Sequence, residues 1–250
     1  MSNLAGKIAL VSGAGSPGGI GFAIAKSLTT QGASVIITST TDRIHDRAKE
    51  IGATGYICDL TDSEATEQLV SKISALDILI NNAGMSSITS PLAEDEASDL
   101  SKITLDGYKR GIARNLDTAF NLSKASLGLL RKSKAGRIIM ISSTTGHLMA
   151  MRNQAVYAAA KAGLIGLTKA LAVDEAINKI TVNAILPGWI KTDTQNEFEY
   201  QQGLKTPLQR SGSADEVASL ATYLASDGAA YITGQAIAVD GGNSIAEERG

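Results

Sequence analysis

The chain has 250 residues, 44% of them hydrophobic and 19% charged, with a net charge of -2. That length predicts one large α/β domain, and the near-neutral charge gives no electrostatic basis for binding nucleic acid or an anionic membrane. The single cysteine, Cys58, excludes an intrachain disulfide and is typical of a reducing compartment.

A strand-like run at residues 7–11 stands almost at the N-terminus. It leaves no room for a signal peptide, and we find no apolar stretch long enough to span a bilayer. We therefore expect a soluble cytoplasmic protein.

Short Val- and Ile-rich runs alternate with helical patterns along the chain. The runs are apolar on both faces, as strands of a covered parallel sheet are. They lie at 7–12, 34–39, 54–58, 76–81, 136–142, 180–185 and 235–239. The helical patterns lie at 19–31, 44–51, 63–74, 98–131, 155–177 and 214–225. This alternation predicts a single α/β domain over residues 1–250, a Rossmann-like, doubly wound parallel sheet of seven strands with helices on both faces.

A glycine-rich turn follows the first strand and opens the first helix. Five glycines stand between residues 13 and 21. Such a turn lets the backbone approach a pyrophosphate, and the helix start points free N–H groups and a positive dipole end at it. The predicted cofactor contacts here are Gly13, Gly15, Ser16, Gly19, Ile20 and Gly21.

The end of the second strand bears on the choice of cofactor. NAD enzymes usually place an acid there to bind the ribose hydroxyls. This chain has Ser39, Thr40 and Thr41 instead, followed closely by Arg43. These residues tolerate a 2′-phosphate and Arg43 can pair with it, so NADP(H) is favoured. NAD(H) stays possible if a loop shift brings Asp42 onto the ribose, and Arg43 is equally explained as a solvated residue at a helix start.

Polar and small residues end the next two strands. Asp59, followed by Leu60, is placed to accept a hydrogen bond from an adenine amino group, although it is also explained as an acid near a helix start. Asp62 is the better candidate for capping that helix. Asn82, Ala83 and Gly84 allow a ligand to lie against the backbone, or form an ordinary turn.

Two longer segments, at about 85–100 and 189–212, follow strands where ligands lie in open α/β sheets, and we expect them to be substrate loops. Candidate pocket residues are Ser86, His147, Met149, Met151 and Trp189. His147 is also explained as polar surface, and the methionines as plain packing. With His45 and His147 the only histidines, no metal site is expected.

Tyr157 and Lys161 stand four residues apart, on one face of a predicted helix, and Ser142-Ser143 ends an apolar run upstream. Together with the glycine-rich turn, these residues resemble the short-chain dehydrogenase/reductase family, and most of all its 3-oxoacyl-(acyl-carrier-protein) reductase branch. The motifs that carry the resemblance are the turn, Asp59, Asn81–Gly84, Asn115, Ser143, Tyr157, Lys161, Asn183–Gly188 and Tyr231–Gly242.

The resemblance implies hydride transfer between a nicotinamide cofactor and a ketone or secondary alcohol. Its catalytic tetrad would be Asn115, Ser143, Tyr157 and Lys161. Tyr157 is the proton donor, with an ordinary pKa of about 10 that a nearby lysine ammonium lowers. Ser143, three residues before Gly146, holds the carbonyl oxygen, and Asn115 anchors a relay water. Substrate contacts would be Ser143, Tyr157, His147, Met149 and Trp189.

The resemblance further implies that Tyr157, Lys161, Pro187, Gly188, Ile190 and Thr192 contact the cofactor. It also implies a homotetramer, with helices 98–131 and 155–177 buried between subunits.

Three features depart from the family. The turn is two residues longer than usual if Gly13 is its first glycine, and starting at Gly15 restores the spacing. Pro17 stands where many NADP-preferring relatives carry a basic residue. The insert at 85–114 is longer than in the fatty-acid branch and carries the acids Glu94, Asp95, Glu96 and Asp99, which disfavour an acidic carrier protein and would suit a cationic substrate.

The leading hypothesis is therefore an NADP-dependent reductase of a small-molecule carbonyl. The alternatives are an NAD-dependent secondary alcohol dehydrogenase, a 3-oxoacyl-thioester reductase and, least favoured, a nucleotide-binding regulator without turnover.

Overall fold

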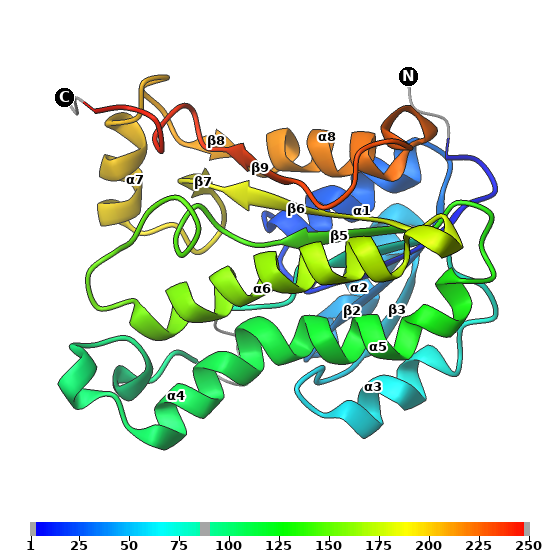
Figure 1. Ribbon diagram of the computed structural model, residues 1–250, viewed down its shortest axis with the longest axis horizontal. Helices are drawn as coiled ribbons and strands as arrows, with labels where there is room; N and C mark the ends of the chain where they lie inside the picture. The colour runs from blue at the N-terminus through cyan, green and yellow to red at the C-terminus, as the bar shows by residue number, and fades with distance from the viewer. Residues whose placement is uncertain (1–3, 86–90, 248–250) are drawn as a thin grey trace.

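A seven-stranded parallel sheet runs through the protein (Figure 1). The computed structural model describes residues 4–85 and 91–247. The strand order is β3-β2-β1-β4-β5-β6-β9. The strands are β1 (Ile8–Ser12), β2 (Ser34–Ser39), β3 (Thr54–Ile57), β4 (Ile78–Asn81), β5 (Arg137–Ile141), β6 (Thr181–Pro187) and β9 (Ala236–Val239). The predicted fold class is confirmed.

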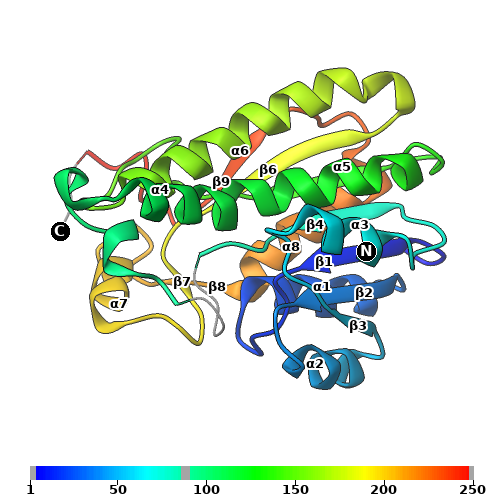
Figure 2. The ribbon, with the colours of Figure 1, turned by 90° about the horizontal axis from the view of Figure 1, so that it is seen from below.

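Helices cover both faces of the sheet (Figure 2). One face carries α3 (Ser63–Val70), α5 (Thr118–Leu130) and α6 (Ala155–Asp174), and the other carries α1 (Ile20–Thr30), α2 (Arg43–Ile51) and α8 (Ala214–Ala225). Each layer has its own apolar core. The strands contribute to both, because successive side chains of a strand point to opposite faces: Leu10 faces one core and Val11 the other.

The order of the strands positions the site. The chain goes from β1 to β2 and β3 on one side, and then returns to β4 on the other side of β1. A crevice forms at the carboxyl ends of strands where the order reverses, and ligands of open α/β sheets bind there. The segments around α4 (Leu105–Ile112) and α7 (Glu197–Leu204) lie at this end (Figure 1), as do the glycine-rich turn after β1 and the residues that follow β4.

The prediction of one continuous helix over 98–131 is wrong. The structure has 3-10 turns at Glu94–Glu96 and Leu100–Lys102, then α4 (Leu105–Ile112), a π-helical turn (Ala113–Asp117) and α5. Helix α4 starts late because Thr104 caps it, accepting a hydrogen bond from the Gly107 amide at 2.9 Å.

The segment 189–212 is more ordered than expected. Strand β7 (Ile190–Lys191) pairs with β8 (Gly212–Ser213), and α7 (Glu197–Leu204) lies between them. Helix α7 starts at a capping box in which Asn196 and Glu199 satisfy each other's backbone N–H groups. The assignment of this segment and of 85–100 as substrate loops, like the single domain, stays a prediction, and candidate residue Ser86 lies outside the described residues.

Helix α6 corrects the statement that no stretch is long enough to span a membrane. Its 20 residues reach a mean hydropathy of 1.4, so length and composition alone would allow a span. The helix packs along β6 and α4 and holds Lys161 buried, and 39% of its apolar window is buried inside the protein. Such a helix is weak support for a membrane location, and beyond it the chain continues as a 3-10 turn at Ala176–Asn178.

Candidate active site

The glycine-rich turn wraps closely around the end of β4. Gly13 takes the left-handed conformation, with φ of +69°, and a Cβ there would lie 2.9 Å from Ala83 Cα. A Cβ at Gly21 would lie 2.6 Å from the Gly13 carbonyl oxygen. Only glycine fits both places. The first glycine of the turn is therefore Gly13, and Ser16 to Gly18 belong to its longer loop.

The start of α1 has free hydrogen-bond donors. Gly19 is the N-cap and makes no side-chain cap. The part of the chain that the structure describes supplies no acceptor for the N–H groups of Ile20 and Gly21. Unpaired amides at a helix start, beside a turn that lacks side chains, fit the pyrophosphate of a dinucleotide.

A cavity of about 570 Å³ lies beside this turn. Twelve of the predicted cofactor residues line it: Gly13, Gly15, Ser16, Ser39, Thr40, Thr41, Arg43, Asp59, Leu60, Asn82, Ala83 and Gly84. These residues come from the ends of β1, β2, β3 and β4. A cavity therefore lies at the crevice expected from the strand order, and the predicted nucleotide contacts surround it.

Hydroxyls and one guanidinium surround the part of this cavity next to β2. The Arg43 side chain donates from Nε to Thr41 Oγ1 at 3.3 Å, and Ser39 Oγ donates to the Thr41 carbonyl oxygen at 3.1 Å. Asp42, the alternative ribose ligand, is exposed at the start of α2 and is not part of the cavity wall. The wall next to β2 thus carries a cation and no acid.

The residues after β3 and β4 are held by their own hydrogen bonds. Asp59 Oδ1 accepts from the amide and the hydroxyl of Thr61, at 3.0 and 2.7 Å. Asp62 caps α3, as predicted, and accepts from the amides of Glu64 and Ala65. Ser12 Oγ accepts from the amides of Asn82 and Ala83, at 2.9 and 3.0 Å, which fixes the end of β4 against β1.

Helix α6 carries Tyr157 and Lys161 to the carboxyl end of β5. The Lys161 ammonium is buried, donates to the Ile141 carbonyl oxygen at 3.0 Å and lies 5.6 Å from the centre of the Tyr157 ring. Burial lowers the pKa of Lys161 from 10.5 to about 8, because water no longer solvates its charge.

The expected lowering of the Tyr157 pKa is not what the structure shows. Burial raises the pKa of the phenol and the negative charge of Glu199 raises it further, whereas a hydrogen bond with Ser143 lowers it. Lys161 does not reach the phenol oxygen, since it bonds to the backbone of β5 instead. Tyr157 is therefore a protonated phenol at neutral pH.

The two serines after β5 have different surroundings. Ser142 Oγ donates to the Lys161 carbonyl oxygen at 2.9 Å and so ties β5 to the backbone of α6. Ser143 Oγ accepts from the Thr145 amide at 3.1 Å and contacts Tyr157. Ser143 is the serine beside the phenol, in agreement with the alternation of side chains along a strand.

Asn115 lies in the π-helical turn between α4 and α5. Its Oδ1 accepts from the Met85 amide at 2.7 Å and its Nδ2 donates to the Gly111 carbonyl oxygen at 3.0 Å. A Cβ at Gly84 would lie 3.2 Å from Asn115 Oδ1 and 3.4 Å from Lys161 Nζ, so both side chains flank Gly84. The four tetrad positions therefore converge between β4, β5 and α6, and π-turns often occur at functional sites.

Other predicted contacts lie outside the wall of the main cavity. They are Gly19, Ile20, Gly21, Tyr157, Lys161, Pro187, Gly188, Ile190 and Thr192. Gly188 nevertheless requires its small size, because a Cβ there would lie 2.6 Å from Asp240 Cβ. Thr192 shares a hydrogen bond with Thr194 at 3.2 Å, at the entrance of the segment that leads to α7.

The candidate substrate residues differ in exposure. Trp189 is half-buried and meets the Phe198 ring edge to face at 6.2 Å, which joins the end of β6 to α7. Met149 is also half-buried, and its sulfur accepts from Asn243 at 3.4 Å. His147 is exposed.

Two of the acids of the insert form ion pairs within the chain. Asp95 pairs with Arg110 at 2.7 Å, and the buried Glu96 pairs with Arg110 and Arg114 at 3.2 and 3.1 Å. Arg110 and Thr104 also lower the pKa of Asp95 through hydrogen bonds, with that of Thr104 the stronger. These contacts neutralise Asp95 and Glu96, whereas Glu94 and Asp99 stand exposed, so a preference for a cationic substrate stays a prediction.

Several residues of the cavity wall were not among the predicted cofactor contacts, although three of them lie in the predicted substrate loops at 85–100 and 189–212. These wall residues are Pro17, Thr38, Cys58, Thr61, Met85, Arg110, Ala113, Arg114, Thr118, Asp193 and Thr194. Two signals were available: Arg110, Arg114 and Thr118 repeat every four residues, as one helical face does, and Asp193 follows Thr192 directly. Burial of Cys58 raises the pKa of its thiol.

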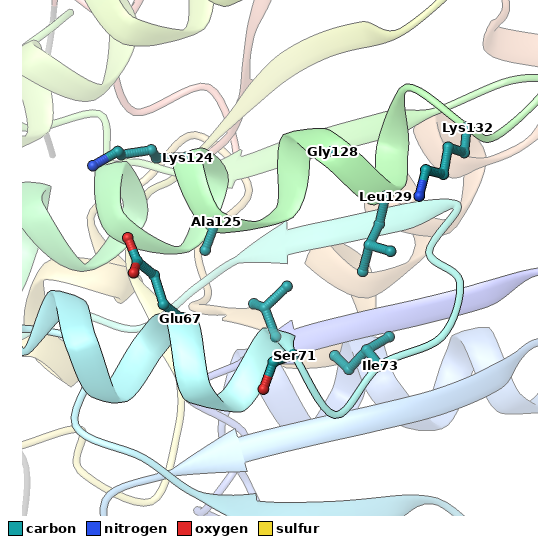
Figure 3. A pocket seen from close by; sticks show the side chains of 9 residues that line it. Glu67, Ser71, Ile73, Lys124, Ala125, Gly128, Leu129 and Lys132 are labelled. Carbon is teal, nitrogen blue, oxygen red and sulfur yellow. The ribbon is translucent and has the colours of Figure 1, made fainter.

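A second hollow of about 560 Å³ lies between α3 and α5 (Figure 3). Its floor is apolar, with Ile73 and Leu129, and Glu67, Lys124 and Lys132 stand at its rim. None of the predicted site residues that the structure describes lines it. Among residues 4–85 and 91–247, no group of three or more metal-ligating side chains is found.

The chain is similar to known oxidoreductases over nearly its whole length. A family described as enoyl-(acyl carrier protein) reductase matches residues 13–244. The 3-oxoacyl-(acyl-carrier-protein) reductase FabG of Escherichia coli (strain K12) is 41% identical over 253 residues, which span 96% of this chain and 98% of that protein.

Solved structures agree with the sequence relatives. A mutant short-chain dehydrogenase/reductase of Serratia marcescens has a TM-score of 0.86 and 33% identity, and covers 96% of this chain and 99% of its own. The aldohexose dehydrogenase AldT of Thermoplasma acidophilum, in ligand-free form, has a TM-score of 0.85 and 29% identity, over 97% of this chain and 96% of its own. The protein therefore belongs to the short-chain dehydrogenase/reductase family of NAD(P)-dependent oxidoreductases.

Proposed function

We propose that this protein is a cytoplasmic NADPH-dependent reductase of a carbonyl group, with Asn115, Ser143, Tyr157 and Lys161 as its catalytic residues. The observation that carries the proposal is the convergence of these four side chains next to a cavity that fits a dinucleotide. When bound, the nicotinamide supplies the hydride, and the chain's own residues manage the carbonyl oxygen and its proton.

Proton donation favours reduction over oxidation at neutral pH. Tyr157 carries its proton there, because burial raises the pKa of the phenol. A carbonyl oxygen gains negative charge as hydride reaches its carbon, and Tyr157 can give that oxygen a proton. Ser143, bonded to the same phenol, is placed to hold the oxygen by a second hydrogen bond.

Lys161 and Asn115 support proton transfer. The Lys161 ammonium has a pKa of about 8, so it can exchange protons near neutral pH. Asn115 and Lys161 flank Gly84, and this spacing supports a water between them that returns a proton to the site.

The preference for NADPH rests on the wall next to β2. The 2′-phosphate of NADPH would meet Ser39, Thr40, Thr41 and the Arg43 guanidinium. A ribose with free hydroxyls prefers an acid at this place, and Asp42 lies outside the wall. NAD-dependent oxidation of a secondary alcohol is the alternative.

The substrate is proposed to be a small-molecule ketone, with a 3-oxoacyl thioester as the second candidate. The similarity to FabG favours the thioester. Pairing of Asp95 and Glu96 with Arg110 and Arg114 also weakens the argument from charge against a carrier protein. The apolar surfaces of Trp189 and Phe198 suit the hydrocarbon part of either substrate.

We also propose that the protein is a homotetramer. Large apolar side chains stand exposed on α4, α5 and α6, among them Leu105 at 67%, Phe120 at 50% and Val173 at 78%. Burial of such side chains in a subunit interface would stabilise the assembly. Light scattering of the purified protein tests this, and a monomer at working concentrations would contradict it.

The proposed function is tested by titrating the protein with NADPH and NADH while following nicotinamide fluorescence, and then assaying turnover. The panel contains small ketones, 3-oxoacyl thioesters and secondary alcohols. We expect tighter binding of NADPH and reduction of at least one carbonyl, and a loss of about 100-fold or more in kcat for Tyr157→Phe with dinucleotide binding retained. Preference for NADH with alcohol oxidation would support the alternative, and binding without turnover on the whole panel would support a regulator.

A further inference from the structure

A carboxylate bridge joins two segments of the nucleotide site that are far apart in sequence. Asp193 Oδ2 accepts from Ser16 Oγ at 2.6 Å and from the Gly18 amide at 2.7 Å. Ser16 and Gly18 lie in the glycine-rich turn, whereas Asp193 follows β7, on the way to α7. The bond with Ser16 first, and then that with Gly18, lowers the pKa of Asp193, so the bridge is anionic at neutral pH.

The bridge involves the residues that make the turn longer than usual. Gly18 permits it, since a Cβ there would collide with the Asp193 carboxylate. The φ of Gly18 is not in the left-handed region. The requirement for glycine at this position is therefore contact with Asp193, and not backbone conformation.

Asp193 takes the hydroxyl of Ser16, one of the predicted cofactor contacts, but does not bond to the N–H groups at the start of α1. It bonds to Ser16 and Gly18, before the helix starts, while the N–H groups of Ile20 and Gly21 have no acceptor in the described parts of the chain. A dinucleotide can therefore bind at the start of α1 while the bridge is closed.

The bridge also forms part of the cavity wall. Ser16 and Pro17 line the cavity from the turn, and Asp193 and Thr194 line it from the segment after β7. A molecule that fills the cavity is held at this place by two segments joined through one carboxylate. A molecule that leaves the cavity between these two segments would pass this bridge.

We propose that Asp193 is a positioning residue that latches the segment after β7 onto the glycine-rich turn and slows release of the bound dinucleotide. The proposal rests on the proposed function, since it needs a dinucleotide in the cavity. Charge-assisted hydrogen bonds are the stronger class, and the bridge is exposed to water, so loss of the latch should speed release about tenfold.

The test is a stopped-flow measurement of NADPH and NADH release from the wild-type protein, Asp193→Ala, Ser16→Ala and the double variant. Asp193→Ala removes both hydrogen bonds and should release the dinucleotide about tenfold faster. Ser16→Ala should speed release less, because the Gly18 amide still bonds to Asp193, and the double variant should release no faster than Asp193→Ala. Gly18→Ala should act in the same way, by displacing the carboxylate. A merely structural role would lower thermal stability without this shared effect on release.

Glu197→Ala is the matched control. Glu197 is an exposed acid nearby whose carboxylate accepts a hydrogen bond from Gln201 Nε2 at 2.8 Å, and the release rate should not change. The latch alone would be overturned if the wild-type protein binds the dinucleotide and Asp193→Ala releases it at an unchanged or slower rate. Additive effects of the two single variants on the release rate would overturn it as well. A wild-type protein that binds neither dinucleotide would overturn the proposed function together with the latch.

Discussion

The buried lysine of the site should leave a mark on stability that depends on pH. Lys161 is 4% exposed, and burial lowers its pKa from 10.5 to about 8. At about 1.36 kcal/mol per pKa unit, holding the charge in the folded protein costs about 3 kcal/mol below pH 8. Between about pH 8 and pH 10.5 the unfolded chain binds more protons at this residue than the folded one, so the free energy of unfolding rises with pH.

Lys161→Met removes this dependence and keeps much of the side chain's volume. Urea unfolding of both proteins should be measured from about pH 7.5 to about pH 10. The wild-type protein should gain about 2 kcal/mol over the variant across this range, since other titrating groups are common to both. Lys169→Met, exposed on the same helix, is the control for loss of a lysine and should show no such gain. A difference between wild type and Lys161→Met that does not change with pH would refute the reasoning.

Three further predictions concern single side chains of the site. Ser143→Ala should lower kcat about 100-fold, as steady-state kinetics would show. Ser142→Ala should keep kcat but lower the free energy of unfolding by about 1 kcal/mol in urea unfolding, because it loses its hydrogen bond to α6. In a fluorescence titration, Arg43→Ala should weaken NADPH binding about tenfold and leave NADH binding unchanged. Lys49→Ala, on the same helix but outside the cavity wall, should change neither affinity. Equal effects of Arg43→Ala on both dinucleotides would contradict the assignment of Arg43 to the 2′-phosphate. Gly13 has a left-handed backbone conformation, and Gly13→Ala would place a Cβ against the end of β4. This variant should lower the free energy of unfolding by about 2 kcal/mol, as thermal unfolding would show, and weaken dinucleotide binding in the same titration.

Much of the fold was predictable because its signals are local. Strands such as β1 and β5 are short Val- and Ile-rich runs that are buried on both faces, and hydrophobic pattern alone identifies them. The tetrad was proposed from the family resemblance, and the alternation added that Ser143 stands after a strand and that Tyr157 and Lys161 stand on a helix.

The sequence-based predictions failed in polar segments and where a side chain's partner is distant in sequence. The start of α7 was readable, because Asn196 and Glu199 have capping-box spacing, but the surrounding polar residues concealed it. The π-turn has no signal in periodicity. Burial of Glu96 against Arg114, and the bridge from Asp193 to Ser16, depend on segments that meet only in the folded chain.

The direction of the Tyr157 pKa shift was also beyond the sequence. Four-residue spacing places Lys161 on the same face as Tyr157, and the lysine was expected to act on the phenol. The side chain instead reaches the Ile141 carbonyl oxygen, and burial then dominates the pKa of both groups. Spacing predicts proximity, but not which acceptor a flexible ammonium chooses.

The π-helical turn between α4 and α5 has a consequence for helical phase. An α-helix advances about 100° per residue, so one extra residue in a turn rotates everything beyond it by that angle. Arg110 and Arg114 can therefore face the insert and the cavity, while Leu122 and Leu130 of α5 still point into the core. Deleting one residue from 113–117 would restore a straight helix and turn α4 about 100° against α5, separating Asn115 from Met85 without changing any residue that remains.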